Sequence, residues 1–294
     1  MLAVDLGQSG TRFKHGELLI TSDRGKVAGE NPVQALRAAF ESTQRFQADV
    51  VALSCTGFYG VVTEPQQYLD LCRQFFGATQ VAVIDDGLAG YVGALNGRNG
   101  VVLSVGGGVV AIGGREGQYS HRDGLGSTFG DEGGGFWLGK LAITKALAIR
   151  QGRGDDSEMV DYFANEIDSY FALEIKNSVD AVNLAINTAR KVLDAADAGV
   201  STATAIVDEA AYLLAQTVVA AWYGCGGTRA DSPEIVIQGG PVRNASYSTK
   251  IALEINAKLP NAVIAQSAGD NLDGATWIAQ NLLDDAPPLM LWAR

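Results

Sequence analysis

The sequence is poor in cysteine and has no long apolar run. Its cysteines, Cys55, Cys72 and Cys225, are far apart and form no C-x-x-C pair. This spacing argues against a disulfide framework, a structural zinc site or an iron–sulfur site within one chain. No apolar stretch approaches the roughly 18 residues that span a bilayer, and the N-terminus lacks the basic region and apolar core of a signal peptide. These absences predict a cytoplasmic protein.

Positive charge is also scarce, which restricts the class of partner. The sequence has 22 Lys and Arg against 33 Asp and Glu, a formal net charge of -11, and no run of basic residues. A chain this acidic repels phosphate backbones and anionic lipid headgroups. We therefore expect no nucleic acid and no membrane as a partner, and a small molecule instead.

Two common nucleotide-binding motifs are missing as well. There is no G-x-x-x-x-G-K-[ST] loop, and no G-x-G-x-x-G opens a helix after the first strand. The sequence has instead three glycine turns, each directly after a short apolar run, at residues 7–10, 106–108 and 239–240. Glycine lets backbone N–H groups come close to an anion. One such turn is a weak signal, but the three together favour a phosphate site.

Alternating strand and helix patterns predict an α/β fold. The order strand, glycine turn, strand occurs at the start of the chain and again from Gly100, a duplication of architecture rather than of sequence. Helical spacing dominates the second half, at residues 136–150, 158–171, 180–196 and 202–222, before a buried strand at 235–241. We expect an N-terminal lobe at residues 1–98 and a C-terminal lobe at 99–277. A C-terminal helix at about 278–294 would pack back on the first lobe.

Three carboxylates lie where apolar strands end. Asp5 precedes the first glycine turn, where it would hold Mg²⁺ through water beside a phosphate or, alternatively, only cap the turn. Asp85 and Asp86 follow the apolar run at 81–84, at the strand end where ligands bind in open α/β sheets. One of them is expected to be a general base for a hydroxyl that attacks phosphorus. The alternative is that they only cap the next helix.

A glycine-rich segment at residues 124–137 places Asp131 and Glu132 before an amphipathic helix. The helix dipole alone would explain carboxylates there, but glycines around two carboxylates also suit a pocket that hydrogen-bonds a polyol. The two histidines, His15 and His121, match no catalytic triad, and we assign them no chemistry.

Five motifs in order resemble the sugar kinase/Hsp70/actin superfamily: D-L-G-Q-S-G-T-R, D-D-G-L-A-G, G-V-V-L-S-V-G-G-G, G-D-E-G-G-G-F-W and V-I-Q-G-G-P-V-R-N. Within it, nearly the whole chain is most similar to the N-acetylglucosamine kinase and BadF/BadG-type ATPase family. The resemblance implies two actin-like lobes of the RNase H type with a cleft between them. The second lobe would be the more helical, and the lobes would close over ATP and a sugar.

The resemblance also implies roles for individual residues. Asp86 matches the family's catalytic base, and Mg²⁺ would lie near Asp5. The implied ATP-binding residues are Gly7, Gln8, Ser9, Gly10, Thr11, Gly106, Gly107, Gly108, Gly199, Gly239 and Gly240. The implied sugar-binding residues are Gly57, Asp85, Asp86, Gly124, Gly126, Asp131 and Glu132.

The expected function is that of an ATP-dependent kinase that phosphorylates a hydroxyl of a hexosamine such as N-acetylglucosamine or glucosamine. The second phosphate motif departs from the family's usual G-T-G-S, because Gly107 and Val109 remove both hydroxyls. This departure motivates one alternative, a non-catalytic sugar or nucleotide sensor. A second alternative is an ATPase that drives a partner protein. The helical second lobe offers a natural surface for a homodimer.

Overall fold

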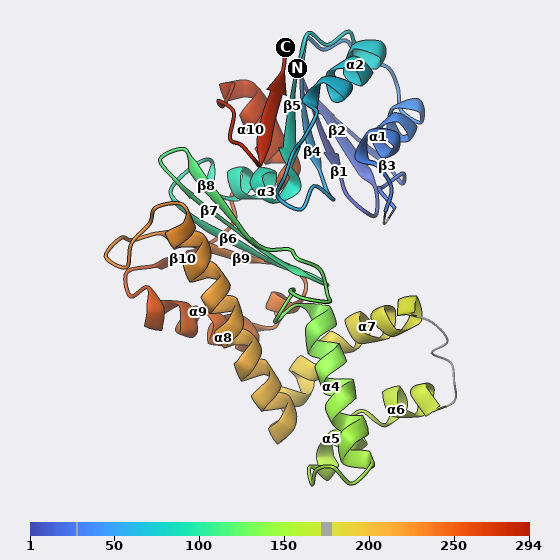
Figure 1. The fold of residues 1–294 in the computed structure, drawn as a ribbon, viewed down its shortest axis with the longest axis vertical. Coiled ribbons are helices and arrows are strands. Elements are labelled where there is room, and N and C mark those ends of the chain that lie inside the picture. The colour runs from blue at the N-terminus through green and yellow to red at the C-terminus, as the bar shows by residue number, and fades with distance from the viewer. Residues whose placement is uncertain (28, 172–177) are drawn as a thin grey trace.

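Two sheets that share a five-strand topology form the frame of the molecule, and the first has one additional edge strand, β11 (Figure 1). The computed structural model describes residues 1–27, 29–171 and 178–294. The first sheet has the order β11-β5-β4-β1-β2-β3 and the second the order β10-β9-β6-β7-β8. In each sheet a leading strand, β1 or β6, pairs antiparallel with the next strand and parallel with a later one, β4 or β9. The predicted duplication of architecture is therefore confirmed.

The strands are short, and those at the centre of each sheet are buried on both faces, as expected of parallel strands covered by helices. In the first sheet they are β1 (Leu2–Leu6), β2 (Thr11–His15), β3 (Leu18–Ser22), β4 (Val50–Cys55), β5 (Gln80–Asp85) and β11 (Met290–Ala293). In the second sheet they are β6 (Gly100–Val105), β7 (Val109–Arg115), β8 (Gln118–Asp123), β9 (Glu234–Gln238) and β10 (Val263–Ala265).

Helices cover both faces of the first sheet. On one face, α1 (Pro32–Glu41) and α2 (Pro65–Phe76) bury an aromatic cluster that includes Phe40 and Phe76. Each of these two helices begins with proline, which lacks the N–H that a first turn leaves unpaired. On the other face, α3 (Asp86–Leu95) and α10 (Asn271–Asn281) lie between the two sheets and share one core with strands of both.

The crossing of α3 and α10 is close because each helix has a glycine there. A Cβ on Gly93 would lie 1.9 Å from the Asp270 carbonyl oxygen, and a Cβ on Gly274 would lie 1.8 Å from the Ala89 carbonyl oxygen. Only glycine permits that approach. The two helices therefore join the lobes through a tight backbone contact.

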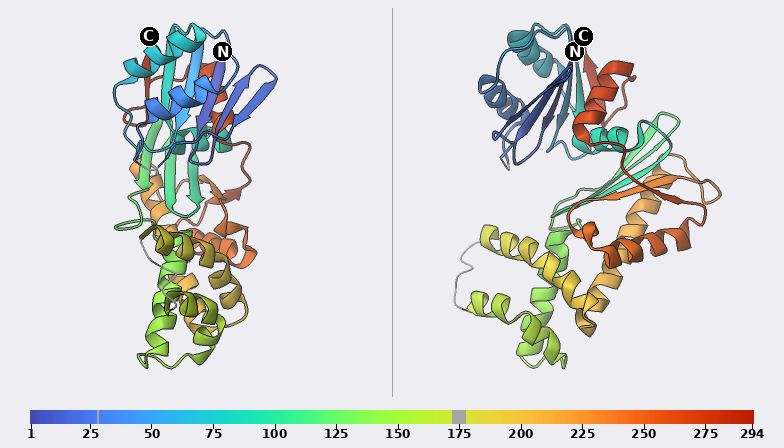
Figure 2. Two further views of the ribbon diagram at one scale, coloured as in Figure 1. Left: turned by 90° about the vertical axis from the view of Figure 1, so that its right-hand side faces the viewer. Right: turned by 180° about the vertical axis from the view of Figure 1, so that it is seen from behind.

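The second lobe carries its helices on the side of its sheet away from the first lobe (Figure 2). Its helices are α4 (Gly135–Arg150), α5 (Ser157–Tyr162), α6 (Ala164–Phe171), α7 (Ser178–Asp197), α8 (Ser201–Gly224), the 3-10 turn η1 (Pro241–Arg243) and α9 (Ala245–Lys258). Among the described residues α8 alone is long and apolar enough to cross a membrane. Leu214, Val218 and Trp222 of α8 are buried in the core of the lobe, so we interpret it as a core helix.

The C-terminus differs from the sequence expectation. The prediction of a helix at residues 278–294 is wrong, because α10 ends at Asn281 and the chain continues to β11, which pairs antiparallel with β5. Pro287 and Pro288 lie between α10 and β11, and proline in a helix interior removes a hydrogen bond and clashes with the preceding turn.

Other elements also differ from the sequence expectation. The helix expected at 158–171 is divided into α5 and α6, and β8, β10 and α9 were not expected. The lobe boundary at residues 98 and 99 stays a prediction.

Candidate functional site

A cavity of about 190 Å³ lies between the two lobes, where the strands β1, β4 and β5 end. Parallel strands bring the residues that follow them to one edge of a sheet, so segments far apart in sequence meet there. The first lobe contributes Gln8, Lys26, Thr56, Gly57, Tyr59, Asp85 and Asp86, and the second contributes Val110, His121 and Gly124. Four predicted sugar-binding residues, Gly57, Asp85, Asp86 and Gly124, therefore line one cavity together with Gln8 of the first glycine turn.

Asp86 is the first residue of α3, and the pKa of its carboxyl group is raised. Burial, followed by the negative charges of Asp85 and Asp5, raises the pKa of Asp86 to about 7, although hydrogen bonds from the Thr56 side chain and the Gly87 backbone oppose the rise. A carboxyl group whose pKa lies near neutral pH is well matched to accepting a proton in a reaction.

Asp85 has a different task from its neighbour. Its Oδ1 accepts a hydrogen bond of 3.0 Å from the Gly87 N–H and caps α3, and its Oδ2 accepts one of 3.1 Å from the Gly60 N–H. Burial raises the pKa of Asp85, and the nearby His121 opposes that rise. The helix-cap alternative thus holds for Asp85, while the side chain of Asp86 is left for a ligand.

Asp5 could take part in binding Mg²⁺ only through water. Its Oδ2 accepts hydrogen bonds of 2.6 and 3.2 Å from Arg12, and its Oδ1 accepts one of 2.9 Å from Ser54. A carboxylate offers about four acceptor positions, so one is left, which fits a single water molecule. No group of three or more His, Cys, Asp or Glu side chains that could hold a metal ion occurs among the described residues. A magnesium ion here would therefore depend on phosphate oxygens as ligands.

The first two glycine turns are built alike. The Gly7 N–H donates to the Gly10 carbonyl at 2.9 Å, and the Gly106 N–H donates to the Gly108 carbonyl at 2.8 Å. Within the described chain, no hydrogen bond is made by the N–H groups of Gln8 and Ser9 in the first turn. Donors left free in a tight turn form the kind of concavity that binds anions. The hydroxyl of Thr11, predicted to bind phosphate, instead donates to the Arg24 carbonyl at 2.6 Å.

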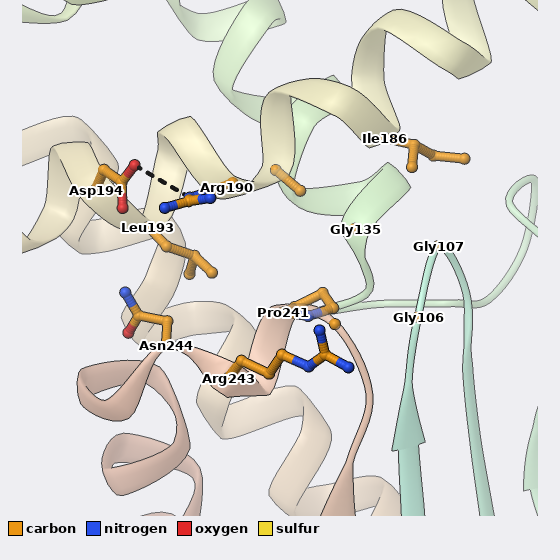
Figure 3. Close-up of a pocket in the computed structure, with 12 residues that line it drawn as sticks. Gly106, Gly107, Gly135, Ile186, Arg190, Leu193, Asp194, Pro241, Arg243 and Asn244 are labelled. Carbon is orange, nitrogen blue, oxygen red and sulfur yellow. Dashed lines mark ion pairs between the residues drawn. The ribbon is translucent and has the colours of Figure 1, made fainter.

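A larger cavity of about 680 Å³ lies in the second lobe, beside the second and third glycine turns. Figure 3 shows Gly106 and Gly107 at the tip of the β6–β7 hairpin, α7 on one side, and Pro241, Arg243 and Asn244 on the other. The cavity volume falls in the range of small-molecule and cofactor pockets. Its lining residues are Gly106, Gly107, Gly135, Ile186, Ala189, Arg190, Leu193, Asp194, Gly240, Pro241, Arg243 and Asn244.

The third turn shows why glycine is needed next to this cavity. Gly239 has φ +121°, and a Cβ there would lie 1.9 Å from the Val105 carbonyl oxygen. Any other residue would push β9 away from the end of β6. Gly239 thus sets the close approach of the two strands, and Gly240 lines the cavity.

Eleven predicted site residues line neither cavity: Asp5, Gly7, Ser9, Gly10, Thr11, Gly108, Gly126, Asp131, Glu132, Gly199 and Gly239. Asp131 accepts a 2.9 Å hydrogen bond from the Val109 N–H and supports the second glycine turn, while Glu132 is exposed. Gly126 lies in a turn in which its carbonyl accepts from the Gly130 N–H. Gly199 has φ +89° in the turn after α7, which is the usual place for a glycine that ends a helix. Sequence spacing alone could not separate these supporting roles from ligand contacts.

Sequence reasoning missed other residues of the two cavities. His121, assigned no chemistry, lines the interlobe cavity, as does Lys26, a single lysine in a loop that carries no sequence signal. Residues 186, 189, 190, 193 and 194 of α7 line the larger cavity. Their spacing marks one helix face and was visible in the sequence, but this pattern is equally typical of a core helix.

The two cavities separate the first two glycine turns in this structure. Gln8 lines the interlobe cavity, whereas Gly106 and Gly107 line the larger one. The hairpin β6–β7 contributes to both, because its Val110 lines the interlobe cavity. The first glycine turn thus lies on the interlobe cavity and the second on the larger cavity, and the β6–β7 hairpin lines both cavities.

Several solved structures with the same fold are described as sugar kinases. A candidate N-acetylglucosamine kinase from Chromobacterium violaceum superposes with a TM-score of 0.65 at 21% identity, over 95% of this chain and 98% of that chain. A second from Porphyromonas gingivalis gives 0.63 at 14% identity, over 96% and 99%. A ROK family glucokinase from Streptomyces griseus, solved with glucose and AMPPNP, gives 0.53 at 15% identity, over 96% and 99%. At these identities the likeness establishes the fold of two actin-like lobes.

Sequence comparison identifies the family. No match among the curated proteins is significant. The BadF/BadG/BcrA/BcrD ATPase family, however, matches residues 3–276, which include both lobes, all three glycine turns and Asp86. The chain therefore belongs to the BadF/BadG/BcrA/BcrD ATPase family, whose name implies that it binds ATP.

Proposed function

We propose that the protein is an ATP-dependent kinase that transfers the γ-phosphoryl group to a hydroxyl of a hexosamine such as N-acetylglucosamine or glucosamine. The observation that carries the proposal is Asp86, with a pKa of about 7, in the interlobe cavity next to Gln8 of the first glycine turn. A base matched to neutral pH thus lies beside a turn suited to phosphate. The interlobe cavity is separate from the larger cavity of the second lobe, so it offers room for an acceptor sugar. An ATPase that only activates water has less need of such an acceptor pocket.

The transfer needs one base and fixed positions for two substrates. The acceptor hydroxyl gives its proton to the Asp86 carboxylate while its oxygen bonds to the γ-phosphorus, and the bond from that phosphorus to the β–γ bridging oxygen breaks to release ADP. Asp85 holds α3 and Gly60 in place, so that Asp86 keeps its position. Magnesium bound with ATP would neutralise phosphate charge, with Asp5 reaching it through water.

The adenosine part of ATP fits the larger cavity. Its apolar wall is formed by Ile186, Ala189 and Leu193 of α7, and its opposite wall by Gly240 and Pro241. Such a slot suits a planar base between apolar surfaces. Arg243 in the same cavity supplies positive charge for phosphates.

The decisive experiment measures phosphorylated products by mass spectrometry with ATP, Mg²⁺ and a panel of amino sugars and hexoses. We expect product with at least one hexosamine, and Asp86→Asn should lower kcat by about 10²–10⁴-fold because the base is lost. Asp49→Asn is the matched control, since Asp49 is exposed and precedes β4 at the other edge of the sheet. Sugar phosphorylation that survives Asp86→Asn unchanged would contradict the assignment.

The family name favours a second candidate, an ATPase that drives a partner protein. Hydrolysis of ATP at the same rate with every sugar and with none would support it. The missing hydroxyls at Gly107 and Val109 motivate a non-catalytic sensor, which would bind sugar or ATP in calorimetry and yield no product.

A further inference from the structure

Lys26 is a nearly buried cation in the wall of the interlobe cavity. Lys26 lies in the loop between β3 and α1, and the residue is 8% exposed. The ammonium nitrogen would lie 2.7 Å from a Cβ on Gly57, so it lies against a backbone that carries no side chain. Gly57, Thr56, Asp86 and Gln8 line the cavity with it.

The backbone around Lys26 is fastened to the first glycine turn. The Lys26 N–H donates to the Gly7 carbonyl at 2.9 Å. The preceding Gly25 is packed so closely that a Cβ there would lie 2.2 Å from the Gln8 carbonyl oxygen. The hydrogen bond from Thr11 to Arg24 makes a third connection. Lys26 is therefore held in a fixed place relative to the proposed phosphate loop.

No acidic side chain forms an ion pair with Lys26 among the residues that the structure describes. Of the nearby acids, Glu30 pairs with Arg24 and accepts from the Val27 N–H, Asp5 pairs with Arg12, and Asp85 accepts from two backbone groups. Enclosing an unpaired ammonium group in a protein is unfavourable. Lys26 attracts Glu30 electrostatically without forming an ion pair with it, so its ammonium group in the cavity wall is suited to pair with a ligand anion.

The position of Lys26 identifies that anion. The acceptor hydroxyl must approach Asp86, and the phosphate chain must approach Gln8, so the γ-phosphoryl group must lie between them, in the cavity that Lys26 also lines. During transfer, charge spreads over the equatorial oxygens of this group, and a fixed cation stabilises it. The second glycine turn lacks hydroxyl donors, because Gly107 and Val109 stand there. A lysine from the other lobe supplies the missing donor.

We propose that Lys26 binds the γ-phosphate of ATP and stabilises the transferring phosphoryl group, in place of the hydroxyl donors that the second glycine turn lacks. The proposal rests on the proposed function only in its use of ATP. The γ-phosphate is the one part of ATP that ADP does not have. Lys26 should therefore distinguish ATP from ADP in binding, whether or not a sugar is present.

The test is calorimetric titration of Lys26→Met with MgATP and with MgADP, alongside kcat for the best sugar. We expect ATP affinity to fall about tenfold or more, which matches the strength of a charge-assisted hydrogen bond, while ADP affinity stays within about twofold. Lys26→Arg should recover part of the loss because it restores a cation. Lys145→Met is the control, since Lys145 is an exposed residue of α4. Lys26→Gln repeats the measurement if the methionine variant does not fold.

Equal losses of ATP and ADP affinity, or no loss of either, would overturn the proposal. So would a variant in which only the KM for the sugar rises, because Lys26 would then contact the acceptor. If no sugar is phosphorylated but Lys26→Met still removes the preference for ATP over ADP, the kinase assignment fails and the role of Lys26 stands. If a sugar is phosphorylated but Lys26→Met leaves the preference for ATP over ADP unchanged, the kinase assignment stands and the proposed role of Lys26 fails.

Discussion

Two adjacent carboxylates in this site differ because their surroundings differ. Asp85 uses both oxygens to accept backbone hydrogen bonds, whereas Asp86 accepts from the Thr56 side chain and the Gly87 backbone and lines the cavity. Hydrogen bonds to a carboxylate favour its charged form, and burial opposes it. At the scale of single residues, the neighbours of each group decide which one is left for chemistry.

The pKa of Asp86 determines how activity should depend on pH. As a base, Asp86 works only when deprotonated, so kcat/KM should fall about tenfold per pH unit below about 7 and level off above it. Thr56→Val removes a hydrogen bond that lowers this pKa, so the inflection should move to higher pH. Initial rates between pH 5 and 9, with ATP saturating, measure both curves.

Stability must be checked in the same range, because unfolding at low pH would produce a similar loss of activity. Circular dichroism at each pH provides this control. A flat profile from pH 5 to 9 in a protein that stays folded would rule out Asp86 as the base.

The helix crossing between the lobes depends on two glycines rather than on large side chains. Glycine in a helix interior costs about 1 kcal/mol relative to alanine, and Gly93 and Gly274 both lie in helix interiors. Their Cα atoms face the carbonyl groups of the partner helix, so close packing offsets the loss in helix propensity. At the scale of elements, the position of α10 against α3 follows from this contact.

Gly274→Ala tests which effect is larger. Propensity favours alanine by about 1 kcal/mol, but the new Cβ would lie 1.8 Å from the Ala89 carbonyl oxygen, and a backbone group has little room to move. We expect a net loss of about 1–3 kcal/mol in the free energy of unfolding. Urea unfolding followed by circular dichroism measures it.

Gln280→Ala is the control for that experiment, because Gln280 is an exposed residue of the same helix. Its effect should stay within about 0.5 kcal/mol. If Gly274→Ala is as stable as the unchanged protein or more so, the crossing does not depend on close backbone contact.

The whole molecule consists of two similar lobes joined by the α3–α10 pair, and the proposed ligand contacts are divided between them. Gln8, Lys26 and Asp86 belong to the first lobe, while Gly106, Gly107 and Gly240 belong to the second. If ATP binds in the larger cavity as proposed, we expect its γ-phosphate to reach Asp86 when the first and second turns approach each other, because the two turns line different cavities. Phosphoryl transfer in this protein should therefore require closure of the lobes.

Small-angle X-ray scattering provides the measurement of closure. With a non-hydrolysable ATP analogue, Mg²⁺ and the sugar that is phosphorylated, we expect a smaller radius of gyration than for the free protein, because the lobes come together around the ligands. The analogue without Mg²⁺ and sugar serves as the comparison. A radius that does not change with any ligand would show that the lobes need not move.

The choice of Asp86 within a pair of carboxylates came from the family resemblance and stays a prediction. The sequence by itself determined the α/β class, the repeated strand–glycine turn–strand unit and the family. Each of these depends on local order along the chain: apolar runs, glycine after a strand and a short spacing between motifs. An apolar run followed by a glycine turn is a local pattern, so the strands and turns of the fold could be predicted from the sequence without knowing any contact between distant residues.

Only the tertiary structure decided which residues meet. Asp131 supports a glycine turn instead of lining the interlobe cavity, and Lys26 and His121 line that cavity although nothing in their local sequence predicts it. The C-terminal segment became a strand because the edge of β5 offered it backbone partners. Contacts of this kind join residues far apart along the chain, and they are fixed by packing rather than by local pattern.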